Sequence, residues 1–275
     1  MIDEEYADII HETFPEIKIK DCHFLGEGNF ATTFLLNGDI VFKISDADEA
    51  AIKEAKREVF VLKHINQKLS FNIPKIVYEG RMYQGRWVFG ETLLPGVTYS
   101  YDIHDDLSRK KQSDILRQIG SIMRELHGLK VMDKNNFYSV SDYQENLDLF
   151  NKNLTEHVRD YVGPDGVEQL REIYQRYKFL STNYPVKPVF VHGDLHYGNL
   201  MFDKKSKKIT GVIDFGSSHL AEPSRDMLYY YGDGVNDLLQ GYGKTNDAYL
   251  SERQKFQFVL RYIESINAEM RLRAK

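Results

Sequence analysis

The sequence predicts an α+β protein with two lobes, a β-rich N-terminal lobe at residues 1–93 and a mainly helical C-terminal lobe at residues 94–275. Three observations predict this. Short β-type runs surround a single helical segment in the first lobe, the sequence Leu94-Pro95-Gly96 breaks the chain, and helical patterns dominate after the break. A chain of 275 residues is long enough for two lobes to bury apolar cores.

The N-terminal lobe begins with runs of β-branched and aromatic residues. The sequence Asn37-Gly38-Asp39 is a strong hairpin signal between two of these runs. Residues 48–69 have helical periodicity, and Pro74 ends any helix before the next strand. The expected strands are residues 24–25, 32–36, 40–44, 76–78 and 86–92.

The C-terminal lobe begins with an apolar stripe of helical period that ends at Gly128. Two further amphipathic helices, residues 142–162 and 167–183, are separated by glycines and a proline. A β-type island follows at residues 189–191, 200–202 and 209–213. From Arg225 onward we expect helices, except in the glycine-rich residues 232–243.

Composition and charge exclude several classes of function. Cys22 is the only cysteine, so no internal disulfide can form and a reducing compartment fits best. No run approaches the roughly 18 apolar residues of a membrane helix, and the acidic N-terminus is unlike a signal peptide. The net charge of −5 argues against a nucleic-acid partner and favours a cationic one. We expect a cytoplasmic monomer with no membrane and no nucleic-acid partner.

A glycine-rich turn at residues 26–31 has the pattern Gly-x-Gly-x-x-Ala. Dinucleotide-binding folds use a similar pattern between a strand and a helix. Because β-type sequence lies on both sides here, we expect a hairpin lying over nucleotide phosphates. We also expect Gly26 and Gly28 to need unusual backbone freedom, and Ala31 to be tolerated as the third small residue.

Lys43 lies in an apolar strand, and Glu58 lies at the centre of the apolar stripe of the helix that follows. A carboxylate on a buried stripe is costly unless a cation meets it. We therefore predict an ion pair between Lys43 and Glu58. Glu54, at the edge of the same stripe, is the alternative partner.

Two acidic loops carry the strongest chemical signal. Asp194 and Asn199 lie in His-Gly-Asp-Leu-His-Tyr-Gly-Asn, and Asp214 lies in Ile-Asp-Phe-Gly after two further β-type runs. We expect these three side chains at the ends of adjacent strands. Carboxylate and amide oxygens suit Mg²⁺, so Asn199 and Asp214 could hold Mg²⁺ while Asp194 accepts the proton of an attacking hydroxyl.

These two motifs resemble the aminoglycoside phosphotransferase and choline kinase superfamily. With Lys43, the helix around Glu58 and the dipeptide Ile73-Pro74, the chain is most similar to the aminoglycoside 2″-phosphotransferases. The resemblance covers nearly the whole chain. It implies a two-lobed, protein-kinase-like fold, Mg²⁺ as cofactor, and ATP or GTP as co-substrate.

The resemblance also implies a role for each matching residue. Asp194 would be the catalytic base, Asn199 and Asp214 would bind Mg²⁺, and His192 and Asp226 would brace the catalytic loop. The nucleotide would be held by two glycines, an ion pair and a hinge whose backbone reads the base: Gly26, Gly28, Lys43, Glu58, Glu91, Thr92, Leu93 and Leu94.

The acceptor is open between three readings: an aminoglycoside in antibiotic resistance, a metabolite or macrolide (choline, homoserine, methylthioribose), or a protein. Only 12 positions separate Asp214 from Asp226, too few for the activation segment of a protein kinase. A catalytically dead binding module would lack a key residue, and none is lost. We expect a cationic small molecule, held by carboxylates chosen from Asp142, Glu145, Asp148, Asp233 and Asp237.

Overall fold

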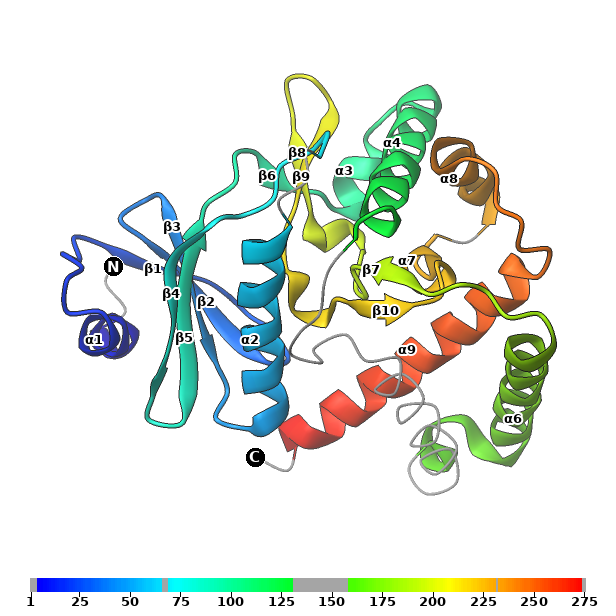
Figure 1. The fold of residues 1–275 in the computed structure, drawn as a ribbon, viewed down its shortest axis with the longest axis horizontal. Helices are drawn as coiled ribbons and strands as arrows, with labels where there is room; N and C mark the ends of the chain where they lie inside the picture. Colours follow the sequence, from blue (N-terminus) through cyan, green and yellow to red (C-terminus); the bar gives the residue numbers. More distant parts are fainter. Residues whose placement is uncertain (1–3, 66–68, 131–157, 231, 274–275) are drawn as a thin grey trace. The chain divides into compact units, whose positions relative to one another are not determined.

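The computed structural model describes residues 4–65, 69–130, 158–230 and 232–273 (Figure 1). Its elements up to the middle of the chain are α1 Glu4–Thr13, β1 Cys22–Glu27, β2 Ala31–Leu36, β3 Ile40–Ser45, α2 Glu49–His64, β4 Ile76–Tyr83, β5 Arg86–Thr92, β6 Val97–Thr98, α3 Tyr101–Asp105 and α4 Arg109–His127. The later elements are α6 Arg159–Asn183, β7 Val189–Val191, η1 Tyr197–Asn199, β8 Leu200–Asp203, β9 Lys208–Val212, η2 Phe215–Ser217, β10 His219–Ala221, α7 Ser224–Met227, η3 Gly232–Gly234, α8 Val235–Tyr242 and α9 Leu250–Arg273.

The chain divides into two compact units. Unit 1 contains Met1–Gln112 and His196–Ser218, and unit 2 contains Ser113–Leu195 and His219–Lys275. The predicted lobes, 1–93 and 94–275, differ from this division. Backbone hydrogen bonds attach the later segment His196–Ser218 to unit 1. Asn72 N donates to Thr210 O at 2.9 Å, and Val212 N donates to Asn72 O at 2.9 Å. Strand β6 also pairs with β8.

Unit 1 contains an antiparallel five-stranded sheet in the order β1-β2-β3-β5-β4. All the strands expected between residues 24 and 92 are present. The predicted hairpin turn joins β2 to β3, with positive φ at both Asn37 (54°) and Gly38 (80°), as a type I′ turn requires. Helix α2 begins after its N-cap Asp48 and ends at His64, five residues before the predicted end at Leu69.

Helices α1 and α2 cover opposite faces of this sheet (Figure 1). Side chains alternate between the faces of a strand. Phe42 and Ile44 of β3 therefore pack with Ile10 of α1, and Phe89 of β5 packs with Val59 of α2. The sequence analysis expected only one helix in the first lobe and missed α1, whose apolar residues cover the second face of the sheet.

Unit 2 is mainly helical. The predicted apolar stripe of α4 is buried, and α6 and α9 share a core that includes Tyr177 and Phe256. The expected break between two helices is present at Gly163, where φ is 69°. Most of the predicted helix at residues 142–162 lies outside the described residues.

The glycine-rich stretch expected to be non-helical contains helix α8, so that prediction was wrong for residues 235–242. The glycines allow two helices to approach closely. A Cβ at Gly120 of α4 would lie 2.0 Å from Leu238 O, and a Cβ at Gly241 of α8 would lie 1.8 Å from Arg117 O. Within the described ranges, no helix is long and apolar enough to cross a membrane.

Candidate active site

Strand β3 directs Lys43 towards helix α2. Lys43 lies directly opposite Phe89 in the β3–β5 ladder, so the two side chains share a face of the sheet. That face is the one on which Phe89 packs against Val59 of α2. Glu91, two residues after Phe89, points to the same side.

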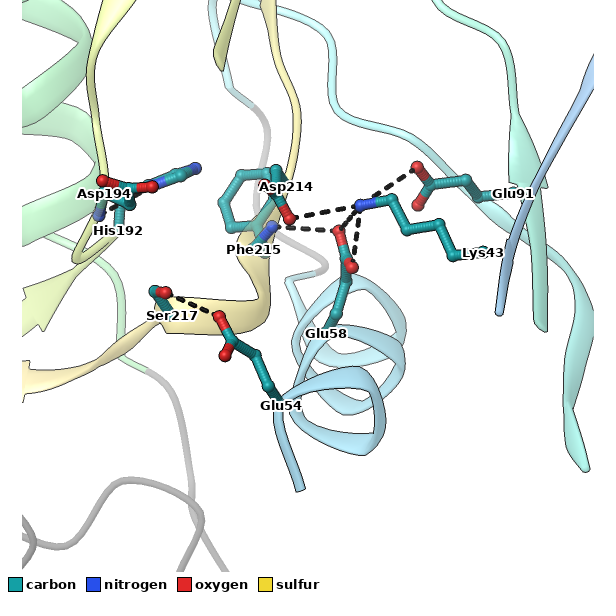
Figure 2. A network of polar contacts seen from close by, with 9 residues as sticks. All are labelled: Lys43, Glu54, Glu58, Glu91, His192, Asp194, Asp214, Phe215 and Ser217. Carbon is teal, nitrogen blue, oxygen red and sulfur yellow. Dashed lines mark hydrogen bonds and ion pairs between the residues drawn. The ribbon is translucent and has the colours of Figure 1, made fainter. Parts of the chain in front are cut away.

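Three carboxyl groups surround the Lys43 ammonium (Figure 2). Lys43 Nζ donates to both oxygens of Glu58, at 2.7 and 2.9 Å, and lies 3.2 Å from Asp214 Oδ1 and 3.8 Å from Glu91 Oε1. Burial by itself would lower the pKa of Lys43, but the charges of Asp214, Glu58 and Glu91 raise it well above its ordinary value. The predicted Lys43–Glu58 ion pair is therefore confirmed, and Lys43 is a cation.

The side chain of Glu91 was not anticipated, because the sequence analysis considered only its backbone. The residue is buried, and its Oε2 has no hydrogen-bond partner among the described residues. Burial raises the pKa of Glu91 to about 8.

Helix α2 also fixes the segment that follows Asp214. Phe215 N donates to Glu58 Oε1 at 3.0 Å, and Ser217 Oγ donates to Glu54 Oε1 at 2.7 Å (Figure 2). Glu54, the alternative partner for Lys43, thus contacts Ser217 instead, and Glu58 is the partner of Lys43 that the helix-phase argument preferred. Burial is the main cause that raises the pKa of Glu54 to about 7.

Asp214 itself adopts a left-handed backbone conformation, with φ 67° and ψ 67°. This conformation is uncommon outside glycine and is maintained where the surrounding structure imposes it. Here the surrounding contacts are those of Lys43 with Asp214 and of Glu58 with Phe215. They direct the half-exposed Asp214 carboxylate towards Lys43.

Asn199 and Asp214 lie at the same end of the β8–β9 pair. Leu200 pairs with Val212, and Ile213 N donates to Asn199 O at 3.0 Å. One carboxylate and one amide oxygen suit Mg²⁺ that shares its remaining ligands with phosphate and water. Among the described residues no cluster of three His, Cys, Asp or Glu could hold a metal on its own. The donor set therefore fits a metal that arrives with a nucleotide.

The glycine-rich turn forms the predicted hairpin between β1 and β2, with Gly28 N donating to Ala31 O at 2.9 Å. The expectation of unusual backbone freedom at Gly26 and Gly28 was wrong, since neither has a positive φ. A Cβ at Gly26 would meet nothing within 4 Å, and one at Gly28 would lie 3.6 Å from Ala31 O. Gly26 therefore leaves open space above the backbone, whereas a side chain at Gly28 would be in van der Waals contact with Ala31.

The expected hinge, Glu91 to Leu94, covers the end of β5 and the two residues that follow it, and part of its backbone is hydrogen-bonded within unit 1. Thr92 N donates to Lys75 O at 2.9 Å, and Leu93 N donates to Asp39 O at 3.0 Å. The N–H groups of Thr92 and Leu93 are thus already committed, and Glu91 lies within the sheet, opposite Val41 of β3 and Ile76 of β4. Any reading of a base by this segment would use its carbonyl groups and the N–H of Leu94.

In unit 2, Asp226 of α7 holds the backbone of the loop that carries Asp194. Its carboxylate accepts the N–H groups of His192 at 2.9 Å and Gly193 at 2.8 Å. Burial opposes the ionisation of Asp226, but the hydrogen bonds from His127 and Gly193 help to lower its pKa. His127 lies 3.0 Å from Asp226 through Nε2 and 2.9 Å from the Tyr242 hydroxyl through Nδ1.

The β7 strand before Asp194 pairs with β10, and not with β8 as the expectation of adjacent strands required. Asp194 thus belongs to unit 2, whereas Asn199 and Asp214 belong to unit 1. The Asp194 side chain is 16% exposed, and its Oδ1 accepts a hydrogen bond from the Tyr229 hydroxyl. Arg261 of α9 lies 3.1 Å from the same oxygen through Nη2 and donates from Nε to the Tyr229 hydroxyl at 2.9 Å.

Sequence reasoning missed Tyr229 and Arg261, because no local pattern connects α9 to the catalytic loop. It also proposed five acceptor-binding carboxylates. Asp237 of α8 is described and forms an ion pair with Arg117. Asp233 lies in η3. The other three, Asp142, Glu145 and Asp148, lie outside the described residues.

The chain is similar in fold to several solved structures. A GDP and kanamycin complex of APH(2″)-IIia is 22% identical with a TM-score of 0.85, covering 98% of this chain and 93% of that one. A GDP complex of aminoglycoside 2′-phosphotransferase-IIIa is 24% identical with a TM-score of 0.81, covering 99% and 93%. ADP-bound aminoglycoside phosphotransferase APH(2″)-Ib is 21% identical with a TM-score of 0.72, covering 97% and 90%.

These likenesses show a shared fold, that of the aminoglycoside phosphotransferases, which the sequence predicted. The family is assigned from the sequence and not from these structures. A profile of the phosphotransferase enzyme family matches residues 21–257, a range that includes Lys43, Glu58, Asp194, Asn199 and Asp214. The chain belongs to the phosphotransferase enzyme family.

Proposed function

We propose that the protein transfers the γ-phosphoryl group of ATP or GTP to a hydroxyl of a cationic, aminoglycoside-like small molecule. The observation that carries the proposal is the network around Lys43, in which a buried cation meets Glu58 and Asp214 within 3.2 Å. A fixed cation beside a carboxylate with an exposed face is what phosphate binding and metal binding require together.

The residues of unit 1 would bind and orient the nucleotide. Lys43, held by Glu58, would contact the α- and β-phosphates, and the open space above Gly26 would let backbone N–H groups approach the phosphate oxygens. Asn199 and Asp214 would hold Mg²⁺, which when bound supplies positive charge to the phosphate oxygens. The hinge carbonyls and the Leu94 N–H would read the base.

Asp194 of unit 2 would act as the catalytic base. Its carboxylate takes the proton of the acceptor hydroxyl as the oxygen forms a bond to the γ-phosphorus. The bond from that phosphorus to the bridging oxygen of the β-phosphate breaks, and a nucleoside diphosphate leaves. Asp226, by accepting the N–H groups of His192 and Gly193, would keep this base in place.

The acceptor class rests on the net charge of −5 and on the structural relatives, one of which is a complex with kanamycin. The relatives hold GDP or ADP, so both nucleotides are candidates. Phosphorylation of an aminoglycoside in the cytoplasm would protect a cell against that antibiotic. Nucleotide and acceptor are the only partners we propose, with the enzyme acting as a monomer.

A second candidate is a metabolic or macrolide kinase of the same fold, acting on a less cationic acceptor. It is favoured by one observation, the ion pair between Asp237 and Arg117, because this carboxylate is already neutralised. A nucleotide-consumption screen with ATP and GTP would decide between the two. Consumption that depends on kanamycin or gentamicin supports the first candidate. Consumption only with choline, homoserine, methylthioribose or a macrolide rejects it and supports the second.

A further inference from the structure

Two side chains of helix α2, besides the one that pairs with Lys43, contact the segment after Asp214. Ser217 Oγ donates to Glu54 Oε1 at 2.7 Å (Figure 2). Arg57 Nη1 donates to the carbonyl oxygen of the residue before Ser217 at 3.3 Å. Glu54 and Arg57 are three positions apart, so they project from the same side of the helix. All of these residues belong to unit 1.

The Glu54 side chain also packs closely on the backbone of Gly216. A Cβ at Gly216 would lie 2.7 Å from Glu54 Cγ and 3.2 Å from Glu54 Oε1, so a larger residue there would displace the Glu54 side chain. Gly216 is itself buried. Glu54 therefore holds the segment in two ways, by a hydrogen bond to Ser217 and by packing on the residue before it.

The backbone of Asp214 depends on such support from its neighbours. Its left-handed conformation, with φ 67° and ψ 67°, persists in a residue other than glycine only where the surrounding structure imposes it. On the N-terminal side, Ile213 N donates to Asn199 O at 3.0 Å. On the C-terminal side, helix α2 contacts Gly216 and Ser217. Asp214 is thus held from both directions along the chain.

We propose that Glu54 is a positioning residue of the metal site: by holding Ser217 and packing on Gly216, it keeps the Asp214 carboxylate in the direction in which it binds nucleotide-bound Mg²⁺. This inference rests on the proposed function, since it assumes that Asp214 is a metal ligand. Glu54 acts through Asp214 and needs no contact with the metal or the nucleotide. Its role is separate from that of Glu58, which holds Lys43.

The physical reason is the strict geometry that Mg²⁺ requires. Mg²⁺ binds in a nearly ideal octahedron at short distances, so a carboxylate that changes direction binds it less well. Release of Ser217 would therefore weaken the part of nucleotide binding that depends on the metal. The part that depends on Lys43 would remain, because Lys43 is held by Glu58 and not by Glu54.

The test measures nucleotide affinity by titration calorimetry, with Mg²⁺ and with a chelator in its place. The ligands are the non-hydrolysable analogues AMP-PNP and GMP-PNP, and the quantity compared is the gain in affinity that Mg²⁺ gives. Glu54→Ala and Ser217→Ala each remove one end of the hydrogen bond, whereas Glu54→Gln keeps an oxygen that accepts it. Glu49→Gln is the matched control, because Glu49 is an exposed carboxylate in the first turn of the same helix.

In Glu54→Ala and in Ser217→Ala, the gain from Mg²⁺ should fall about fivefold, while the affinity without metal is unchanged. The double variant should fall no further than Glu54→Ala, because both changes remove the same hydrogen bond. Glu54→Gln and Glu49→Gln should keep the wild-type gain. Should Glu54→Ala fail to fold, Ser217→Ala decides the question, since it keeps the packing on Gly216 and removes only the hydroxyl.

A merely structural role of Glu54 would lower the melting temperature and leave the gain from Mg²⁺ unchanged, and that result overturns the inference alone. An equal fall in Glu49→Gln also overturns it, because any loss of charge from α2 would then be sufficient. A wild type that binds nucleotide without any gain from Mg²⁺ removes Asp214 from the metal site and the inference with it. If the wild type binds neither nucleotide, the proposed function and this inference both fail.

Discussion

Lys43 in unit 1 and Asp194 in unit 2 are both held by groups of opposite charge, but in different ways. Lys43 is a buried cation between Glu58, Asp214 and the buried carboxyl of Glu91. Asp194 is a partly exposed carboxylate that contacts Tyr229 and Arg261. The Lys43 side chain is held between carboxyl groups of helix α2, strand β5 and the residue before η2. A group that positions phosphates should be fixed in this way. The Asp194 carboxylate remains partly exposed, as expected of a base that must be reached by an acceptor molecule.

The two surroundings also differ in how the chain builds them. Glu58 follows Lys43 in the next helix, and helical periodicity alone places it on the buried stripe. Arg261 lies on the last described helix, far along the chain from Asp194. Local patterns therefore determine the first arrangement, and only tertiary packing determines the second. The following predictions separate the two arrangements, starting with the largest effect.

Asp194→Asn should abolish turnover and leave nucleotide binding intact. Loss of a positioned base costs on the order of 10²–10⁴ in kcat. The Tyr229 and Arg261 contacts are made on Oδ1, so an amide oxygen there can retain them and the fold should be preserved. Steady-state kinetics and calorimetric titration with nucleotide check this. A variant with more than about a tenth of the wild-type rate would show that Asp194 is not the base.

Glu58→Ala should impair both stability and activity more than Glu54→Ala does. The first change leaves a buried lysine without its main partner and removes the acceptor of Phe215 N, at a cost of up to about 3–5 kcal/mol. The second change removes one hydrogen bond to Ser217, worth about 1 kcal/mol. Urea denaturation and initial rates measure both effects. Equal losses in the two variants would contradict the central role of Glu58.

Asp214→Ala should weaken the binding of nucleotide in the presence of Mg²⁺, with little effect when Mg²⁺ is absent. The carboxylate would link the metal to the phosphates, and its loss should lower affinity at least about tenfold. Titration calorimetry with and without Mg²⁺ makes the comparison within one variant. Unchanged affinity in the presence of Mg²⁺ would remove Asp214 from the metal site.

The last prediction concerns the pH dependence of stability. The pKa of Glu54 rises on folding from 4.5 to about 7, mainly through burial. The folded state therefore binds more protons, so this contribution to stability is complete below pH 4.5 and is lost as the pH rises to about 7. Glu54→Gln should remove up to about 3 kcal/mol of this decline. Denaturation curves between these two pH values compare the variant with the wild type, and parallel profiles would contradict a buried, protonated Glu54.

The sequence predicted the parts of the molecule that depend on local pattern. The strands of the first sheet, the turn at Asn37 and Gly38 and the Lys43–Glu58 pair follow from periodicity and turn chemistry. It missed helix α1, because a short amphipathic helix before the first strand gives a weak signal. It misread α8, because glycines that permit close helix contact resemble glycines of a loop.

The candidate site was predictable where a motif lies within one segment. The closeness of Asn199 and Asp214 follows from the pairing of β8 with β9. The contact of Asp226 with the backbone of the loop that carries Asp194 follows from the family resemblance. Three features required tertiary structure: the buried side chain of Glu91, the contact of His127 with Asp226 and the contact of Arg261 with Asp194. Each joins elements that are distant in sequence, where no spacing rule applies.

The central claim is that unit 1 provides a nucleotide site and Asp194 delivers a hydroxyl to the γ-phosphate. The most direct measurement mixes wild-type protein, ATP or GTP, Mg²⁺ and kanamycin, and quantifies nucleoside diphosphate, inorganic phosphate and phosphorylated kanamycin in one sample. The account predicts one phosphate ester for each nucleoside diphosphate formed, and neither product from Asp194→Asn. Nucleotide turnover that yields only inorganic phosphate, or ester formation that persists in Asp194→Asn, would contradict it.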